Sequence, residues 1–274
     1  MKNSAIPVVI AAGGLGTRVA GWSQMLPKEF RPVEGQPGLL HVLEEVATGG
    51  AKRAVVVHHP YYAKFYAWPC HALSPDAHHH YQQAAGQAAR RRPAAGLNVD
   101  FIGQHGRYAD ITSVLNGADH LRVEHLAFAF ADNVDPTHTA LADLLAVTDP
   151  DLPAVLTAPF DVAGAGCHGV VVCSGSGAVR TMSTLIEKPG PEAAARLANA
   201  YGSDNLRLLQ ERGRVTPMLL RHFAAASRMA PGHAEPKLAL AIADYARHQV
   251  VQVVTGAPLV DLGAPEPSAA AEVV

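Results

Sequence analysis

A glycine-rich turn and two basic residues near the amino terminus could bind a triphosphate. The apolar residues 8–12 run into Gly13-Gly14-Leu15-Gly16-Thr17-Arg18, and Pro27-Lys28-Glu29 follows. Glycine allows positive backbone φ angles, so consecutive N–H groups can converge on an anion. Arg18 and Lys28 would add the fixed positive charge that a triphosphate requires. The pattern therefore predicts a site that activates a nucleotide at its phosphates. It matches neither the dinucleotide fingerprint nor the P-loop.

A carboxylate follows the apolar run at residues 126–131. Asp132 stands where that predicted strand ends, and α/β sheets bind ligands at the carboxyl ends of their strands. A carboxylate there suits Mg²⁺, a hard cation that prefers oxygen ligands. Asp135 is either a reserve ligand or the cap of a helix that begins near Thr137.

A second charged motif, Glu187-Lys188-Pro189, follows another predicted strand. A carboxylate accepts hydrogen bonds from vicinal hydroxyls, and an ammonium group is a compact partner for phosphate. The motif would therefore suit a ligand with vicinal hydroxyls and a phosphate, the alternative being a surface charge pair before a helix.

Alternating strands and helices would position these motifs. Strands are expected at residues 5–12, 54–57, 99–102, 126–131, 154–160, 169–173, 179–186, 206–215 and 250–254. Helices are expected at residues 37–48, 109–121, 191–201, 217–226 and 235–247. The spacing becomes more antiparallel after residue 131. We expect a nucleotide-binding core at 1–160, a sugar-phosphate half of the same domain at 161–263 and a flexible tail at 264–274.

Composition narrows the class of protein. The 274 residues are 49% hydrophobic and 17% charged, with a formal net charge of −2, which indicates a globular enzyme and no nucleic-acid partner. No apolar run approaches the roughly 20 residues that span a bilayer, so no membrane partner is expected. Three scattered cysteines suit a reducing cytoplasm. Arg90-Arg91-Arg92 is expected at a solvated helix end, and His78-His79-His80 in a solvated loop rather than a zinc site.

In order and spacing, these motifs resemble the sugar-phosphate nucleotidyltransferases, nearest to the bacterial glucose-1-phosphate uridylyltransferases (UDP-glucose pyrophosphorylases). The resemblance implies an α/β fold with a Rossmann-like mixed, mostly parallel sheet flanked by helices, the nucleotide-diphospho-sugar transferase fold, plus a small sugar-binding subdomain. It implies a homo-oligomeric enzyme that uses Mg²⁺ and makes an NDP-sugar and pyrophosphate. The expected substrates are a nucleoside triphosphate, UTP being favoured, and glucose 1-phosphate or a related sugar phosphate.

The resemblance also assigns residues. It implies that Asp132 and Asp261 hold the metal and that Arg18, Lys28 and Lys188 are catalytic. The residues implied to bind the nucleotide are Ala11, Ala12, Gly13, Gly14, Leu15, Gly16, Thr17, Gln104 and Gly106. Those implied to bind the sugar phosphate are Gly169, Glu187, Lys188 and Arg212.

Several positions depart from the family pattern. His105 interrupts the Gln-Gly pair, Ala264 replaces Thr after the final Asp-x-Gly, and Lys237 takes a Gln position. Where the family has Gly-Arg-Tyr, this chain has Glu211-Arg212-Gly213-Arg214, and only Arg212 lines up. Two alternatives therefore stay open. One is dTTP or CTP with a cyclitol phosphate, amino sugar phosphate or phosphonate, and the other is a non-catalytic regulatory homologue.

Overall fold

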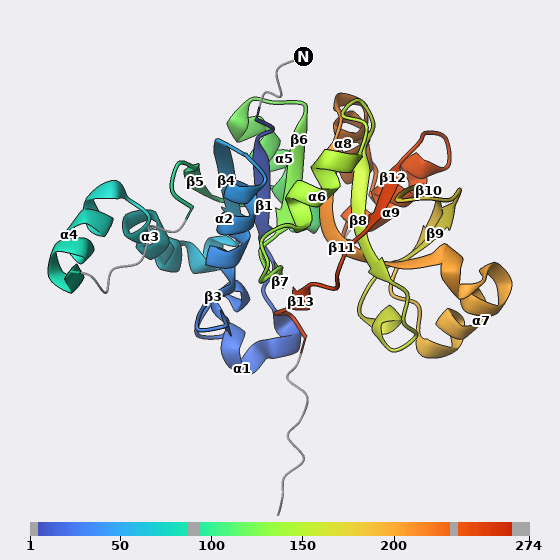
Figure 1. Ribbon diagram of the computed structural model, residues 1–274, viewed down its shortest axis with the longest axis horizontal. Coiled ribbons are helices and arrows are strands. Elements are labelled where there is room, and N and C mark those ends of the chain that lie inside the picture. The colour runs from blue at the N-terminus through green and yellow to red at the C-terminus, as the bar shows by residue number, and fades with distance from the viewer. Residues whose placement is uncertain (1–4, 87–93, 231–234, 265–274) are drawn as a thin grey trace, which may run out of the picture.

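The computed structural model describes residues 5–86, 94–230 and 235–264, and a mixed sheet runs through the whole of that part (Figure 1). Arg90-Arg91-Arg92 and residues 265–274 of the expected tail lie outside the described residues. The nine strands of this sheet are ordered β5 (Asn98–Gly103), β4 (Arg53–His58), β1 (Val8–Ala12), β6 (Leu126–Phe130), β11 (Leu206–Val215), β8 (Ala154–Pro159), β12 (Gln252–Thr255), β10 (Val179–Ile186) and β9 (Val170–Ser174).

The amino-terminal half of the sheet is parallel. β5, β4, β1 and β6 pair in parallel, with Val8 opposite both Ala54 and Ala127. The two central strands of this half, β1 and β6, are apolar throughout because helices cover both faces. Helix α2 (Gly38–Thr48) packs on the face that includes Ile10, and helix α5 (Asp110–Leu121) packs on the face that includes Val9. The turn after β1 therefore opens at the carboxyl edge of the sheet.

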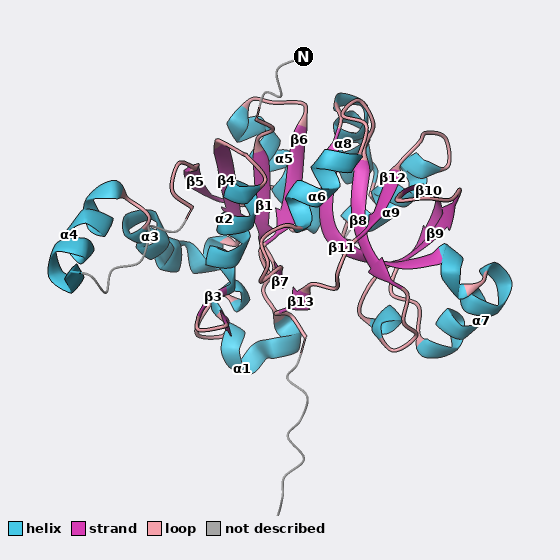
Figure 2. Ribbon diagram, in the orientation of Figure 1, coloured by secondary structure: helices cyan, strands magenta, loops and turns pink. Residues whose placement is uncertain are grey.

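The second half is largely antiparallel, as the spacing predicts. β11 runs antiparallel to β6, β8 and β9, and β10 runs antiparallel to β12 and β9, whereas β12 and β8 are parallel. Helices α8 (Pro217–Met229) and α9 (Leu238–Ala246) join the core on the α5 face. Helix α7 (Pro191–Tyr201) packs through Ala194 on a separate cluster with β9 and β11. A mixed α/β sheet flanked by helices is thus confirmed (Figure 2).

Shorter elements complete the fold. Two small ladders pair β2 (Pro32–Val33) with β3 (Gln36–Pro37) and β7 (Asn133–Val134) with β13 (Val260–Asp261). The remaining helices are α1 (Ala20–Ser23), α3 (Ala63–Ala72), α4 (Pro75–Ala85) and α6 (Ala140–Val147), with 3₁₀ turns η1 (Thr17–Val19), η2 (Lys28–Phe30), η3 (Pro60–Tyr62), η5 (Gly164–Gly166) and η6 (Ser203–Asn205).

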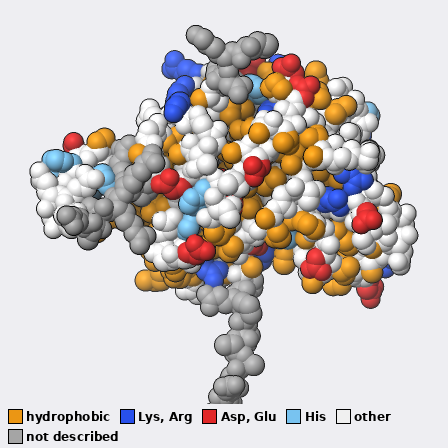
Figure 3. Space-filling view, in the orientation of Figure 1, with side chains coloured by type: hydrophobic (Ala, Val, Ile, Leu, Met, Phe, Trp, Pro, Cys, Tyr) orange, Lys and Arg blue, Asp and Glu red, His pale blue; other side chains and the backbone are white. Residues whose placement is uncertain are grey.

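Helices α3 and α4 project from one end of the molecule. Histidine side chains lie at the surface of this end (Figure 3). The prediction of a loop at His78-His79-His80 is wrong, because these residues belong to α4. Ser74 caps this helix by accepting a hydrogen bond from the Ala77 N–H at 3.2 Å. None of the helices in the described ranges has the length and apolar character needed to cross a bilayer. All three cysteines are free thiols.

Candidate active site

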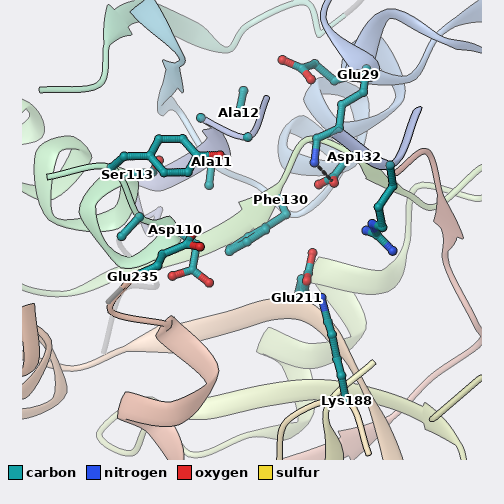
Figure 4. A pocket seen from close by; sticks show the side chains of 16 residues that line it. Ala11, Ala12, Glu29, Asp110, Ser113, Phe130, Asp132, Lys188, Glu211 and Glu235 are labelled. Carbon is teal, nitrogen blue, oxygen red and sulfur yellow. Dashed lines mark hydrogen bonds and ion pairs between the residues drawn. The ribbon is translucent and has the colours of Figure 1, made fainter. Parts of the chain in front are cut away.

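A cavity of about 190 Å³ lies where β1 and β6 end (Figure 4). Many of the residues to which the sequence analysis gives a role in the site line this cavity. The predicted site residues that line it are Ala11, Ala12, Gly13, Gly14, Arg18, Lys28, Asp132 and Lys188. Residues far apart in the sequence therefore face one space.

Glycine is needed in the turn after β1 because side chains lie close against it. A Cβ on Gly14 would lie 3.0 Å from Lys28 Nζ, so the absence of a side chain lets the ammonium group cross the turn. Gly16 has φ +64°, and a Cβ there would lie 2.3 Å from Ser23 Oγ. A Cβ on Gly13 would lie 2.1 Å from Gln104 Oε1. The turn thus holds Lys28 against the edge of the sheet.

Lys28 and Asp132, whose side chains are 14% and 9% exposed, form an ion pair in the wall of the cavity. Burial alone would lower the pKa of Lys28, but the Asp132 carboxylate outweighs it and raises that pKa above its ordinary value. Conversely, burial would raise the pKa of Asp132, and the Lys28 ammonium holds it below its ordinary value. Both groups are therefore charged at neutral pH. Asp132 carries a cation partner that a substrate or metal would have to replace.

Asp261 reaches the same place through the β7–β13 ladder. Asp261 pairs with Asn133, and the Leu262 N–H donates to the Asp132 carbonyl at 2.7 Å. A Cβ on Gly263 would lie 3.0 Å from Asp261 Oδ1 and 3.4 Å from Asp132 Oδ2. The two carboxylates therefore flank one small space. Arg18 is on its rim, with Nη2 3.7 Å from Asp261 Oδ2.

A second cavity of about 170 Å³ adjoins the first. Gly169, Glu187 and Lys188, which the resemblance assigns to the sugar phosphate, line it, and that role stays a prediction. Glu187 Oε1 lies 3.3 Å from Lys237 Nζ and 4.0 Å from Lys188 Nζ. A Cβ on Gly169 would be 3.4 Å from Glu187 Oε2, so this glycine leaves room for the carboxylate.

The prediction that Arg212 binds the sugar phosphate is wrong. Its side chain is fully buried, and Nε and Nη2 donate to Glu45 of α2 at 3.0 and 2.9 Å. Further bonds run to the carbonyls of Phe130 and Asn133. Arg212 therefore supports the strand ends beneath the cavity and lines neither cavity among the described residues.

The neighbouring residue Glu211, rather than Arg212, lines the cavities. The register between β11 and β8 shifts between Leu209 and Gly213, and Glu211 has φ +53°. Its carboxylate accepts a hydrogen bond from Asn133 Nδ2 at 2.7 Å and lines both cavities. Burial, then the charge of Asp132, raises the pKa of Glu211 to about 8. The only sequence signal was a glutamate where the family has glycine.

Other predicted residues support the cavity from behind. Gln104 is buried behind the lining and donates from Nε2 at 2.8 Å to the carbonyl of Ala109, which lines the cavity. Gly106 makes a turn with φ +84°. Leu15 and Thr17 belong to the segment around η1, where the Leu15 N–H donates to the Tyr108 hydroxyl at 3.2 Å. Their roles toward a nucleotide remain predictions.

Two aspartates act as helix anchors. Asp135 accepts from the N–H groups of Thr137, Thr139 and Ala140, each at 2.8 Å, so it caps α6 as one of its two interpretations predicts. Asp110 Oδ1 accepts from the N–H groups of Ile111 and Leu238 at 2.6 and 2.8 Å, which joins α5 to α9 beside the cavity.

The same fold occurs in solved nucleotidyltransferases. A UDP-glucose pyrophosphorylase complexed with UDP-glucose matches with a TM-score of 0.75 and 17% identity over 95% of this chain and 94% of that chain. An inositol-1-phosphate CTP transferase from T. maritima gives 0.66 and 12% over 97% and 92%. A putative glucose-1-phosphate thymidylyltransferase from Bacillus anthracis gives 0.67 and 13% over 95% and 91%.

In sequence, no family model matches the chain, and neither does any curated protein. At these identities the likeness concerns the fold, and the expected nucleotide-diphospho-sugar transferase fold is confirmed.

Proposed function

We propose that this protein converts a nucleoside triphosphate and a sugar 1-phosphate into an NDP-sugar and pyrophosphate. UTP is the proposed nucleotide, and glucose 1-phosphate or a related sugar phosphate is the proposed acceptor. One observation carries the proposal: the cavity lined by the glycine turn and Lys28 shares a wall with the cavity lined by Glu187. Lys188 belongs to both. A transfer between two phosphates needs adjoining sites with a cation between them.

The chain's own groups would supply positioning and charge. An acceptor phosphate oxygen forms a bond to the α-phosphorus while the bond from that phosphorus to the bridging oxygen breaks, and pyrophosphate leaves. Arg18 and the N–H groups of residues 13–16 would hold the β- and γ-phosphates. Lys28 would lie nearer the α-phosphate, where negative charge builds in the transition state. Lys188 would orient the attacking phosphate, so no covalent intermediate with the protein is required.

The donor set at Asp132 and Asp261 fits Mg²⁺. Proteins usually bind this ion through one or two carboxylates together with substrate phosphates and water. Both carboxylates lie within 3.4 Å of the point that a Gly263 Cβ would occupy, and Arg18 Nη2, which the ion would have to displace, lies 2.9 Å from it. No group of three or more His, Cys, Asp or Glu side chains forms a metal site in the described ranges. Bound Mg²⁺ would neutralise phosphate charge, and Lys28 would exchange Asp132 for a phosphate oxygen.

The comparisons support nucleotidyl transfer as a class. Proteins with this fold include one that holds UDP-glucose, one described as a CTP transferase and one described as a putative thymidylyltransferase. They support UTP, CTP and dTTP alike, so the choice of UTP rests on the motif resemblance.

Pyrophosphate release measures the proposed reaction directly. UTP, dTTP and CTP are each incubated with glucose 1-phosphate, with Mg²⁺ or with a chelator. Lys28→Ala and Asp132→Asn are expected to slow release about 100-fold, because one lost charge contact costs roughly 3 kcal/mol of transition-state stabilisation. Lys64→Ala, which alters an exposed lysine on α3, is the matched control. Near wild-type release by Asp132→Asn would refute its assignment.

A further inference from the structure

Acidic side chains dominate the walls of the second cavity. Asp110, Glu187, Glu211 and Glu235 line it, against two basic residues, Lys188 and Lys237. Both lysines lie within 4.0 Å of Glu187. A phosphate on the acceptor would further occupy Lys188. Both positive charges of this cavity therefore already have partners, Glu187 and the acceptor phosphate.

The other three carboxylates lack a cation. Over residues 5–86, 94–230 and 235–264, Asp110, Glu211 and Glu235 have no basic side chain within 4.0 Å. Asp110 is held by two backbone N–H groups and Glu211 by the amide of Asn133. These neutral donors fix where the carboxyl groups stand. Because the pKa of Glu211 is raised to about 8, its carboxyl group keeps its proton at pH 7 in the free protein, and a bound cation would favour its charged form. Like charges held together disfavour one another, and a cation between them removes that cost.

An aromatic ring completes this wall. Phe130, the last residue of β6, lines both cavities. Its ring lies between Asp110 and Glu235 on one side and Glu211 on the other (Figure 4). The face of an aromatic ring attracts an ammonium group, most strongly where water is excluded. A neutral sugar would use carboxylates as hydrogen-bond acceptors but would leave both the charge and the ring unmatched.

We propose that the acceptor carries an ammonium group as well as its phosphate: an amino sugar 1-phosphate, or a smaller amine-bearing phosphomonoester or phosphonate. The phosphate lies against Lys188, and the ammonium group lies over Phe130 between Asp110, Glu211 and Glu235. This inference rests on the proposed function and names the substrate class of the same site. Burial raises the pKa of Asp110 to about 6 in the free protein, which is consistent with a carboxyl that awaits a cation.

Three acceptors that differ at one substituent test the proposal. Glucosamine 1-phosphate, glucose 1-phosphate and N-acetylglucosamine 1-phosphate carry an amine, a hydroxyl and a neutral amide at the same carbon. Phosphoethanolamine and 2-aminoethylphosphonate test the smaller class. Pyrophosphate release is followed with UTP, CTP and dTTP at pH 7. We expect kcat/KM to be at least tenfold higher for an amine-bearing acceptor than for either neutral sugar.

Variants tie the preference to the cavity. Glu235→Gln and Glu211→Gln should each reduce the ratio of amine to hydroxyl kcat/KM at least threefold, and Phe130→Leu should do the same. Glu192→Gln on α7, whose side chain is 94% exposed, is the matched control and should keep the ratio. Glu235 is at the exposed rim, so its variant is expected to fold even if Glu211→Gln does not.

Two outcomes separate this inference from the proposed function. Equal or better turnover of a neutral acceptor, or a ratio that the cavity variants leave unchanged, overturns the ammonium proposal while nucleotidyl transfer stands. If no combination of nucleotide and acceptor releases pyrophosphate, the proposed function is overturned. Calorimetric titration with glucosamine 1-phosphate and glucose 1-phosphate then still decides the cavity's preference, and equal affinities refute it.

Discussion

Replacing Arg212 with methionine tests whether this residue supports the fold or binds substrate. Its guanidinium and the Glu45 carboxylate are both 0% exposed and share two hydrogen bonds of 2.9 and 3.0 Å. Removing one partner leaves the other charge buried without compensation, which costs about 3–5 kcal/mol. Arg212→Met should therefore lower the free energy of unfolding by about that amount.

The cost would be a large share of the total stability, since domains are stable by only about 5–15 kcal/mol. Urea titration followed by circular dichroism measures it. Glu45→Leu should cost a similar amount, and the double variant should be more stable than the sum of the two single losses predicts, because no charge is left stranded. Arg196→Met is the control: its surface pair with Glu192 at 3.9 Å should contribute less than about 1 kcal/mol.

Kinetics then separate the two roles. If Arg212 only supports the strand ends, the folded fraction of Arg212→Met keeps an acceptor KM within about threefold of wild type. A loss of stability below about 1 kcal/mol together with a tenfold rise in acceptor KM would refute the structural role. It would mean that the guanidinium reaches the acceptor.

Three glycine and glutamate substitutions give further predictions. Gly263→Ala should raise the Mg²⁺ concentration for half-maximal activity at least tenfold, because its Cβ would lie 3.0 Å from Asp261 Oδ1; an unchanged Mg²⁺ titration contradicts this. Gly13→Ala should cost about 1–3 kcal/mol in urea unfolding, since its Cβ would lie 2.1 Å from Gln104 Oε1, and wild-type stability would refute that contact. Burial raises the pKa of Glu29 from 4.5 to about 8, so the folded state keeps a proton that the unfolded chain releases, and wild-type stability should fall as pH rises across that range. Glu29→Gln should flatten this fall by up to about 1.4 kcal/mol per pH unit, and parallel pH profiles for the two proteins would show that Glu29 is not its source.

The parts of the site that the sequence predicts are local. The glycine turn follows a strand whose apolar run is visible in the sequence, and Asp132 and Lys188 each follow another. Because the carboxyl ends of parallel strands share one edge, strand order alone brings the turn and Asp132 together. Each of these inferences needed only the position of a motif relative to the nearest strand.

Arg212 was predicted to face the cavity, but Glu211 faces it instead. The sequence alone does not show this, because it depends on the local backbone of β11. Side chains alternate between the faces of a regular strand, and an irregularity in the strand pairing breaks that alternation locally. Here β11 shifts register against β8, and Glu211 takes a positive φ that non-glycine residues seldom adopt. The resemblance to the family's Gly-Arg-Tyr motif favoured the arginine, whereas the local backbone turns the glutamate toward the cavity.

Local sequence patterns also do not predict that Asp132 and Asp261 lie close together. Contacts between segments distant in the sequence bring them together. Two residues of β7 pair with two of β13, a ladder too short to predict from its residues. Arg31, which follows the Pro27-Lys28-Glu29 motif, donates from Nη1 to the carbonyls of Leu262 at 2.7 Å and Ala264 at 3.0 Å. The segment that carries the phosphate-side lysine therefore also holds the segment that carries the second carboxylate. A displacement of either motif would move the other, so the two halves of the proposed metal and phosphate site are positioned as one unit.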